Sequence, residues 1–480
     1  MTRISLVVIL GIAIAPSARA DLLEVQIPGT PLVVMLQGGV KYNQGRTVTF
    51  THRLGSIYFS RDSVRKNHKV PTFASLFTRQ LGSARDADSA MNAARWALKH
   101  GLLPSFYRAV EKALSYDSQH AAATRVMALK RKFDLDLGPY TNEEAHLRKT
   151  VRNPNMKVAT SKHFVLLHDT PDTPPPVYSK NAKKLKPRAV ARLELLEKVY
   201  ESFLMKFYSQ GVELEIPQVR MMVVLFHQER DYLQFATSLS PDLASAIGFY
   251  NPRINVSSFY DHGTSEEYKP LRQLSDSLQS RRAEYIKNKD GDKVRLADTL
   301  SLLTVIGQEN SDIEVVSHEA THQIAGNTGL FPRHVLIPQW VHEGLATYFE
   351  APDEATWSGM GAVNEQRLDW YRALARDRVH SNIGFIVGDQ IFKYARTDGA
   401  VLHGYGQAWA LTHFLLDRHF EEFMTYYQRL GQMPPDITLS PEILTKLFDD
   451  TFKTNRAALE NEWRSYMASL KTDLEVILGN

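Results

Sequence analysis

The hydrophobic pattern divides this 480-residue chain into three parts with different periods. Residues 21–84 hold short apolar runs separated by turn signals such as GGVKYNQG, which predicts a small β-rich module. Residues 85–137 change to helical spacing around a break at Gly101–Pro104, and they predict a helical hairpin. Residues 155–480 begin with strand-like runs and continue with helical ones, an order that predicts an α+β domain.

Two strands, one amphipathic helix and one β-hairpin are predicted at the start of the α+β domain: HFVLLHD (163–169), MMVVLFHQ (221–228), residues 192–211 and GFYNPRINVSSFYD (248–261). The segment 138–156 before them is polar and broken by Gly-Pro and Asn-Pro pairs, so we place the main domain boundary there. Residues 262–293 are charged and poor in large aliphatic side chains, which indicates a surface insertion.

The first 20 residues have the pattern of a signal peptide. A basic start is followed by an apolar run from Ile4 to Ala15, and Ala18-Arg19-Ala20 has the small-residue pattern of a cleavage site. The run is shorter than the roughly 20 residues that cross a bilayer, although an uncleaved anchor is the alternative. We therefore expect cleavage near Ala20 and a secreted or periplasmic protein without stable membrane insertion.

Composition limits the kinds of site and partner. The chain has no cysteine, which excludes thiol nucleophiles and cysteine-ligated zinc, so any metal must be held by His, Asp or Glu. A net charge of +4 is far from the basic field of a nucleic-acid binder, and no nucleic-acid partner is expected. The densest basic stretch, residues 180–192, is interpreted as a solvated face rather than a binding patch.

The stretch SHEATHQIAG places two histidines four residues apart around a glutamate. On an α-helix four residues turn through about 400°, so His318 and His322 project from one side and can both reach one zinc ion. Ser311 and Glu314 form an S-x-x-E capping box, which predicts that the helix begins there. Glu319 lies about 100° away, where it can reach a water on the metal without being a ligand.

The segment IPQWVHEGLATYFE supplies a third ligand. Glu343 follows His322 after 20 intervening residues, a gap that suits a connection and a returning helix. Gly344 and Ala346 keep one face of that helix small, which allows close helix approach. Two His and one Glu leave a fourth position for water, as in a catalytic zinc site rather than a closed structural one.

With both motifs identified, the chain resembles the gluzincin branch of the zinc metallopeptidases, whose shared elements are an HExxH helix and a later E-G-x-A helix. Here they are HEATH and WVHEGLATYFE, and the chain is most similar to secreted peptidase-MA-like members, in which a Y-x-Q-A element like Tyr405–Ala408 also recurs. The resemblance covers residues 160–430. It implies a zincin-like peptidase domain with a small mixed sheet, active-site helices and a helical C-terminal part. The G-x-M-E-N element of aminopeptidase N is absent, so trimming from the N-terminus is not supported.

A second resemblance concerns the predicted helical hairpin. The placement of Trp96, Gly101, Ala113 and Asp117 is similar to that in a single tetratricopeptide (TPR) unit. One unit is too short for a repeat array, so packing against a neighbouring domain is favoured over an independent peptide groove.

The expected function is a secreted zinc-dependent peptidase, an endopeptidase, with a peptide or protein substrate. One zinc ion lowers the pKa of a bound water toward about 7, and Glu319 acts as the general base. By resemblance Tyr405 is the candidate donor to the oxyanion, with a packed core tyrosine as the alternative. The competing interpretation is a catalytically inactive zincin-fold protein that acts as an extracytoplasmic binding or scaffold module through residues 86–133.

Several neighbouring residues receive weaker assignments. Thr347 and Glu350 could accept hydrogen bonds from the ligand imidazoles, with surface or packing roles as the alternative. His342 is predicted to point to another helix face, and His403 and His413 to have packing or surface roles. The edge of the predicted hairpin could hold an extended peptide by β-addition, and an ordinary solvent-facing hairpin is the alternative.

Overall fold

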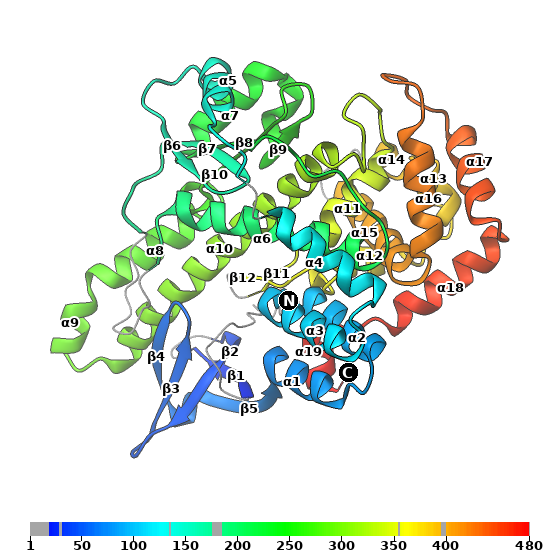
Figure 1. Cartoon of the computed structure of the whole chain (residues 1–480). Coiled ribbons are helices and arrows are strands. Elements are labelled where there is room, and N and C mark those ends of the chain that lie inside the picture. The colour runs from blue at the N-terminus through cyan, green and yellow to red at the C-terminus, as the bar shows by residue number, and fades with distance from the viewer. Residues whose placement is uncertain are drawn as a thin grey trace.

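The computed structural model of the chain describes residues 19–27, 31–133, 136–174, 185–353, 356–394 and 400–479. These residues form a mixed α+β protein with two five-stranded sheets (Figure 1). The predicted signal peptide lies outside them, apart from Arg19 and Ala20, which begin the first strand. Among the described helices, none combines the length and the apolar character needed to cross a bilayer.

The first sheet is antiparallel and lies at the lower left of Figure 1. Its order is β4-β3-β2-β1-β5, with these bounds: β1 (Arg19–Gln26), β2 (Val33–Tyr42), β3 (Thr47–His52), β4 (Gly55–Ser60) and β5 (Val64–Pro71). Alternate strand residues such as Leu23, Val25 and Phe50 form an apolar face. Leu302 and Ile306, which belong to a much later helix, complete this core.

Four helices follow the first sheet: α1 (Phe73–Ser83), α2 (Ala87–Lys99), α3 (Leu103–Tyr116) and α4 (Ala121–Phe133). The sequence predicted a two-helix hairpin within residues 85–137, so α4 was missed there, and α1 was missed at the end of the predicted β-rich module. The Asp117 side chain accepts from the Gln119 N–H in a local turn, so α3 ends and α4 starts afresh. All four helices contribute to one hydrophobic cluster that also includes the helices of the C-terminal half.

The second sheet is mixed, with the order β6-β7-β8-β10-β9. The predicted strands and hairpin are confirmed, and the bounds are β6 (Lys157–Thr160), β7 (Phe164–His168), β8 (Met221–Phe226), β9 (Gly248–Asn251) and β10 (Val256–Tyr260). The central strands β7, β8 and β10 run parallel, whereas β6 and β9 pair antiparallel at the two edges. Strand β9 is therefore available at one edge of the sheet.

Helices cover both faces of the second sheet. In β7, Phe164 and Leu166 face one hydrophobic cluster while Val165 and Leu167 face the other, as the period of a strand requires. One face packs on α6 (Arg188–Ser209), which confirms the predicted amphipathic helix, and on α10 (Gly291–Asn327). The other packs on α5 (Thr141–Val151) and α7 (Glu229–Leu239). Helix α5 lies in the polar segment that we interpreted as a boundary, and its Leu147 is fully buried on the sheet.

Helix α10 has 37 residues and begins about six turns earlier than the sequence predicted. The Asp290 side chain caps its N-terminus by accepting from the Lys293 N–H, so the proposed capping box is wrong. Ser311 instead bonds Tyr268 and Glu314 bonds a distant arginine. The predicted surface insertion contains α8 (Lys269–Ser280) and α9 (Arg282–Lys287), which contact α10 and are exposed or half-buried apart from Ser275 and Tyr285.

Helices dominate residues 339–479, of which α13, α14, α16, α17 and α18 lie at the right of Figure 1. The elements are α11 (Gln339–Phe349), β11 (Pro352–Asp353), β12 (Thr356–Trp357), α12 (Glu365–Leu374), α13 (Ile383–Val387), α14 (Ile391–Tyr394), α15 (Ala400–Arg418), α16 (Phe420–Gly431), α17 (Pro441–Phe452), α18 (Arg456–Ser469) and α19 (Asp473–Leu478). Helix α11 lies between α10 and α15. Gly344 permits the approach to α15, because a Cβ there would lie 2.2 Å from the Thr412 Oγ1 and 2.7 Å from the Ala408 carbonyl oxygen.

This contact predicts that Gly344→Ala destabilises the protein. The added methyl group has no space between α11 and α15, and overpacking of this kind costs about 1–3 kcal/mol. Gly82→Ala in α1 is the matched control, because its Cβ would have nothing within 4 Å and alanine favours the helix. Thermal unfolding followed by circular dichroism should show a lower midpoint for Gly344→Ala and an unchanged or higher midpoint for Gly82→Ala. Equal midpoints for the two variants would contradict the close α11–α15 contact.

Candidate metal centre

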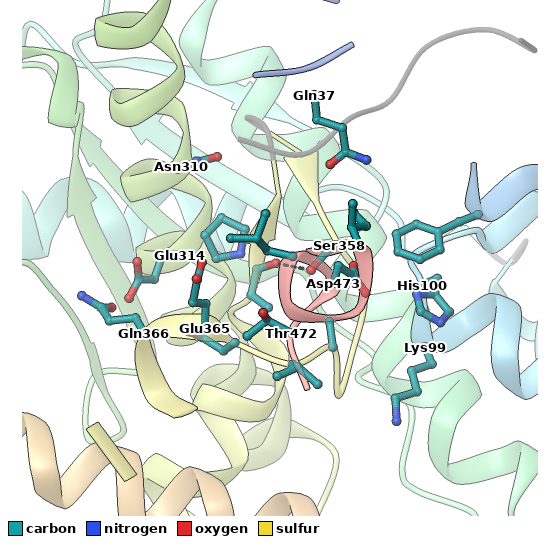
Figure 2. Close-up of a pocket in the computed structure, with 18 of the residues that line it drawn as sticks. Gln37, Lys99, His100, Asn310, Glu314, Ser358, Glu365, Gln366, Thr472 and Asp473 are labelled. Atoms are coloured by element: carbon teal, nitrogen blue, oxygen red, sulfur yellow. Dashed lines mark hydrogen bonds between the residues drawn. The ribbon is translucent and has the colours of Figure 1, made fainter. Parts of the chain in front are cut away.

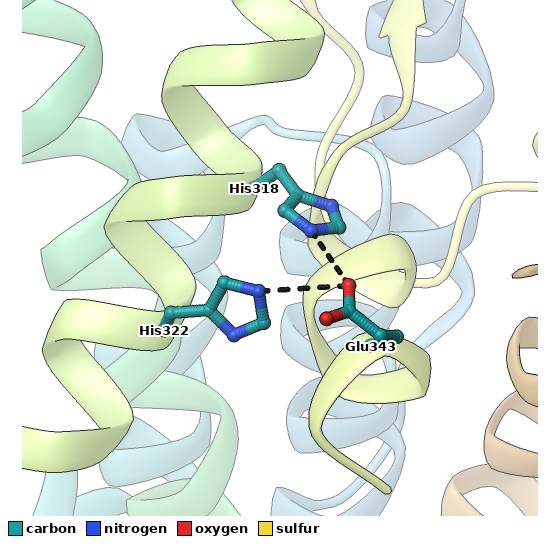
Figure 3. A group of neighbouring side chains, drawn as sticks. All are labelled: His318, His322 and Glu343. Carbon is teal, nitrogen blue, oxygen red and sulfur yellow. Dashed lines mark hydrogen bonds and ion pairs between the residues drawn. The ribbon is translucent and has the colours of Figure 1, made fainter. Parts of the chain in front are cut away.

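Two histidines of α10 and one glutamate of α11 point toward one another (Figure 3). The Glu343 Oε2 atom lies 3.1 Å from the His318 Nε2 and 3.7 Å from the His322 Nε2. The three ligand atoms lie within 4.8 Å of one another. Two ligand atoms bound tetrahedrally at about 2.0–2.1 Å from one zinc ion are separated by about 3.4 Å, and the two distances from Glu343 lie on either side of this value. The predicted ligand set is therefore brought together, and it fits zinc.

The neighbouring His342 does not point away, as the sequence had suggested. Its ring stacks on the His322 ring, with centroids 3.8 Å apart and an interplanar angle of 7°. The His342 Nδ1 atom lies 3.8 Å from the Glu343 Oε1 atom. We infer that His342 fixes the ring plane of His322, and it is not one of the three residues whose ligand atoms converge.

A buried carboxylate orients the first histidine. Glu350 has no solvent exposure, and one of its oxygens accepts from the His318 Nδ1–H at 2.8 Å. Its other oxygen accepts from the Arg367 Nε–H at 2.5 Å and from the Asn364 side-chain amide at 3.2 Å. With Nδ1 donating to Glu350, the His318 Nε2 atom faces the metal position. The acceptor role suggested for Glu350 is thus the one that the structure shows.

Thr347 does not accept a hydrogen bond from a ligand imidazole, so this part of the prediction is wrong. Its hydroxyl donates to the backbone carbonyls of Glu343 and Gly344, at 2.8 and 3.0 Å, within its own helix. The hydroxyl group therefore donates its hydrogen bond to the preceding turn of α11 and not to an imidazole.

Two contributing residues were missed by the sequence analysis. Arg367 of α12 joins Glu350 to Glu314 of α10, whose carboxylate lies 3.0 Å from it. The Asp389 carboxylate accepts from the Trp340 N–H at 3.1 Å and so caps the start of α11. Both side chains come from segments far from the motifs they support, and no local spacing rule connects them.

The charges around the site are set by these contacts. Burial disfavours the imidazolium of His318, but hydrogen bonds to Glu343 and Glu350 raise its pKa well above the usual 6.5. The pKa of His322 is lowered to about 3, by burial first and by His342 second. Despite burial, its histidine partners hold the pKa of Glu343 well below 4.5. At neutral pH the metal-free group therefore contains one imidazolium, one neutral imidazole and one carboxylate.

The predicted general base lies beside this group. Glu319 is 8% exposed, and burial raises the pKa of its carboxyl group to about 7. It faces the second sheet: a Cβ on Gly248 of β9 would lie 3.1 Å from the Glu319 Cγ. Glycine at that position lets the edge strand pass directly against the glutamate.

Tyr405 also lies near the candidate ligands. Its ring centroid is 6.4 Å from that of His318, and the Arg367 guanidinium carbon lies 5.3 Å from the Tyr405 ring centroid. The Glu343 charge first, and burial second, raise the pKa of the phenol, so it retains its proton. His403 and His413 instead contact the backbone carbonyls of Trp370 and Gly361, and both have packing roles.

A separate cavity of about 310 Å³ lies next to the side chains that hold Glu350 and Arg367 in place (Figure 2). Glu314 and Asn364, which bond Arg367 and Glu350, are in its wall. None of the three candidate ligands lines it. The cavity thus borders the supporting network and not the metal position.

Residues 312–436 match the sequence model of a family described as a protein of unknown function, DUF1570. The matched segment contains the three candidate ligands together with Glu319, Glu350, Arg367 and Tyr405. Searches of curated proteins and of solved structures found no match. The family description names no activity, so the function must be inferred from the side chains themselves.

The Glu350 contact predicts that Glu350→Gln weakens zinc binding by about 10- to 100-fold, because the variant loses the charge that orients and polarises His318. Glu462→Gln is the matched control, since that carboxylate also bonds a histidine, His419, at 3.1 Å, but on the surface. Competition titration with a chromogenic chelator measures both affinities. Equal zinc affinity in the two variants would show that Glu350 does not support the ligand.

The raised pKa of His318 predicts that zinc binding releases a proton. At pH 7 this imidazole is protonated in the metal-free protein, and zinc must displace that proton, so the affinity rises with pH up to the His318 pKa. Calorimetry in two buffers of different ionisation enthalpy should show release of at least one proton per zinc, because the Glu319 carboxyl group, with a pKa of about 7, also gives up part of its proton. A binding enthalpy independent of the buffer would contradict a protonated His318.

Proposed function

We propose that this chain is a zinc-dependent peptidase that cleaves within peptide or protein chains, with His318, His322 and Glu343 as the metal ligands. The observation that carries the proposal is the convergence of their three ligand atoms within 4.8 Å, next to a buried Glu319. The HExxH and E-G-x-A elements, which resemble those of gluzincins, support the same assignment. Three protein ligands leave a coordination position for water, as catalysis requires.

The chemistry follows from the positions of the charged groups. A zinc ion held by these ligands would supply a Lewis acid and lower the pKa of a bound water toward about 7. Burial raises the pKa of Glu319 to about 7 in the metal-free protein, and a divalent cation beside it favours the carboxylate form. Glu319 would then take a proton from the attacking water and pass it to the leaving amine.

Tyr405 is the proposed donor to the oxyanion. Its phenol stays protonated because the nearby Glu343 charge and burial both oppose ionisation. The Arg367 guanidinium lies against its ring and also bonds Glu350, so one residue holds both the tyrosine and the carboxylate behind His318. A neutral, positioned donor of this kind stabilises charge that develops during the reaction.

The edge position of β9 supports endopeptidase action. An extended substrate that paired with β9 would add a strand to the second sheet. Gly248 lies directly against Glu319, so such a substrate would pass the general base in mid-chain. This arrangement needs no pocket for a chain terminus.

The remaining assignments belong to the same proposal. Residues 155–480 would form a zincin-like peptidase domain, preceded by the β-rich module of residues 21–84 and a TPR-like hairpin within residues 85–137. Cleavage of the signal peptide of residues 1–20 would deliver the protein to the periplasm or the exterior.

The proposal predicts that Glu319→Gln lowers the rate of peptide hydrolysis by about 10²- to 10⁴-fold, because the amide cannot accept the water proton. Zinc content should stay at one ion per chain, since Glu319 is not a ligand. Digestion of a mixed peptide library, read by mass spectrometry, measures the rate, and elemental analysis measures the metal. Glu462→Gln again serves as the control and should cleave like the unmodified chain.

Two results would count against the enzyme. Unchanged cleavage by Glu319→Gln would eliminate the proposed base. Bound zinc with no cleavage of any library peptide by the unmodified chain would favour the alternative, a binding or scaffold module that has kept the fold.

A further inference from the structure

A second polar cavity, of about 180 Å³, lies among α2, α6, α11 and α15. Three cationic side chains line it, Arg95, Lys99 and Lys206, together with one carboxylate, Asp417. None of the candidate metal ligands belongs to its lining. The cavity therefore holds an excess of two positive charges and is distinct from the metal centre.

Lys206 lacks a polar partner in this cavity. Its ammonium group lies 5.6 Å from the Tyr348 ring centroid and 5.7 Å from that of Phe420, so its nearest partners are aromatic faces. Within the described part of the chain, no hydrogen-bond acceptor and no carboxylate in ion-pair range is recorded for it. The pKa of this lysine is lowered to about 8: burial is the main cause, the Asp417 charge opposes it, and the Lys99 and Arg95 charges add to it.

Arg95 has one unused donor as well. Its two terminal nitrogens donate to the Asn92 side chain at 3.0 Å and to the Ser209 carbonyl at 3.1 Å. The buried Nε–H has no acceptor. Buried donors in folded proteins nearly always have an acceptor, so an unpaired one on a side chain that lines the same cavity as Lys206 points to a ligand.

The single carboxylate cannot satisfy these donors. Asp417 accepts from the Tyr466 hydroxyl at 3.0 Å, and its other oxygen lies 3.9 Å from the Lys99 Nζ atom. Among the described residues no ion pair joins Asp417 to Lys206 or Arg95, although its charge acts on Lys206. A cavity of about 180 Å³ greatly exceeds the roughly 10–15 Å³ that one water needs, so a polyatomic ion has room.

We propose that this cavity binds a small anion with two negative charges, a phosphate or a short dicarboxylate, between Arg95, Lys99 and Lys206. Two charges balance the excess in the cavity, and oxygen acceptors match the unused N–H donors. The anion would connect α2 with α11 through the Tyr348 wall, so it would brace the helix that carries Glu343 and Glu350. The site does not depend on the proposed peptidase activity.

Calorimetric titration of the full chain tests the site with sodium phosphate and, separately, sodium succinate, against sodium chloride at equal ionic strength. We expect saturable binding of one of the two dianions and none of chloride. Lys206→Met keeps the aliphatic stem but removes the charge, and it should weaken binding by about tenfold or more. Arg95→Gln should weaken it as well. Lys446→Met is the control, because that side chain is 75% exposed and remote from the cavity.

The outcomes distinguish a phosphate from a carboxylate ligand, and they distinguish binding in the cavity from binding at the metal centre. Phosphate binding alone identifies an inorganic or phosphoryl ligand, and succinate binding alone identifies a carboxylate ligand. His322→Gln, which removes a candidate metal ligand, should leave the anion affinity unchanged. The proposal is overturned if neither dianion binds, or if Lys206→Met and Arg95→Gln bind as tightly as Lys446→Met. It is also overturned if His322→Gln abolishes binding, since the anion would then lie at the metal centre.

Discussion

The candidate site depends on one constraint: the fixed orientation of α10 about its own axis, which decides which side chains face α11. Two buried polar side chains on the sheet-facing side fix it. The Gln323 amide donates to the Met222 and Asn255 carbonyls and accepts from Ser257, while Asp312 accepts from the backbone and ring N–H of His262. Eleven residues separate them, about three turns, so both face the sheet. A rotated α10 would bury these groups without partners, which is costly, and His318 and His322 are thereby held toward α11.

The orientation of α11 is set by contacts that lie outside both sequence motifs. Gly344 lets the helix sit against α15, Asp389 caps its start, and Glu350 at its end receives both His318 and Arg367. Glu350 is a fully buried carboxylate, and removing either of its two cationic partners would leave its charge only partly compensated in a low-dielectric interior. The carboxylate therefore couples ligand geometry to the packing of α12. Precise ligand placement results from this support and not from the ligand residues alone.

Sequence patterns predicted the parts of the molecule whose signals are local. Strands β7 to β10 of the second sheet, α6 and the facing pair His318 and His322 all depend on spacing within about 20 residues, and all are present, whereas the edge strand β6 was not predicted. The predictions that were wrong concern side chains whose partners are distant in the sequence. Ser311, Asp312 and Glu314 look like a helix start, but each is used mid-helix by a distant partner, in Tyr268, Arg192 and Arg367. The stacking of His342 on His322 and the roles of Arg367 and Asp389 likewise arise only when segments far apart in the chain meet.

The length of α10 ties the N-terminal sheet to the candidate site. A helix of 37 residues spans about 55 Å, and Leu302 and Ile306 in its first half complete the core of the first sheet while its second half carries the ligands. Helices α2 to α4 share a hydrophobic cluster with α6, α11 and α15. Their apolar faces are thus already used in packing, which argues against an independent peptide groove in that hairpin. The N-terminal elements are better understood as a brace for α10 and α11, so substitutions in their buried faces should act on the site through the stability of those two helices.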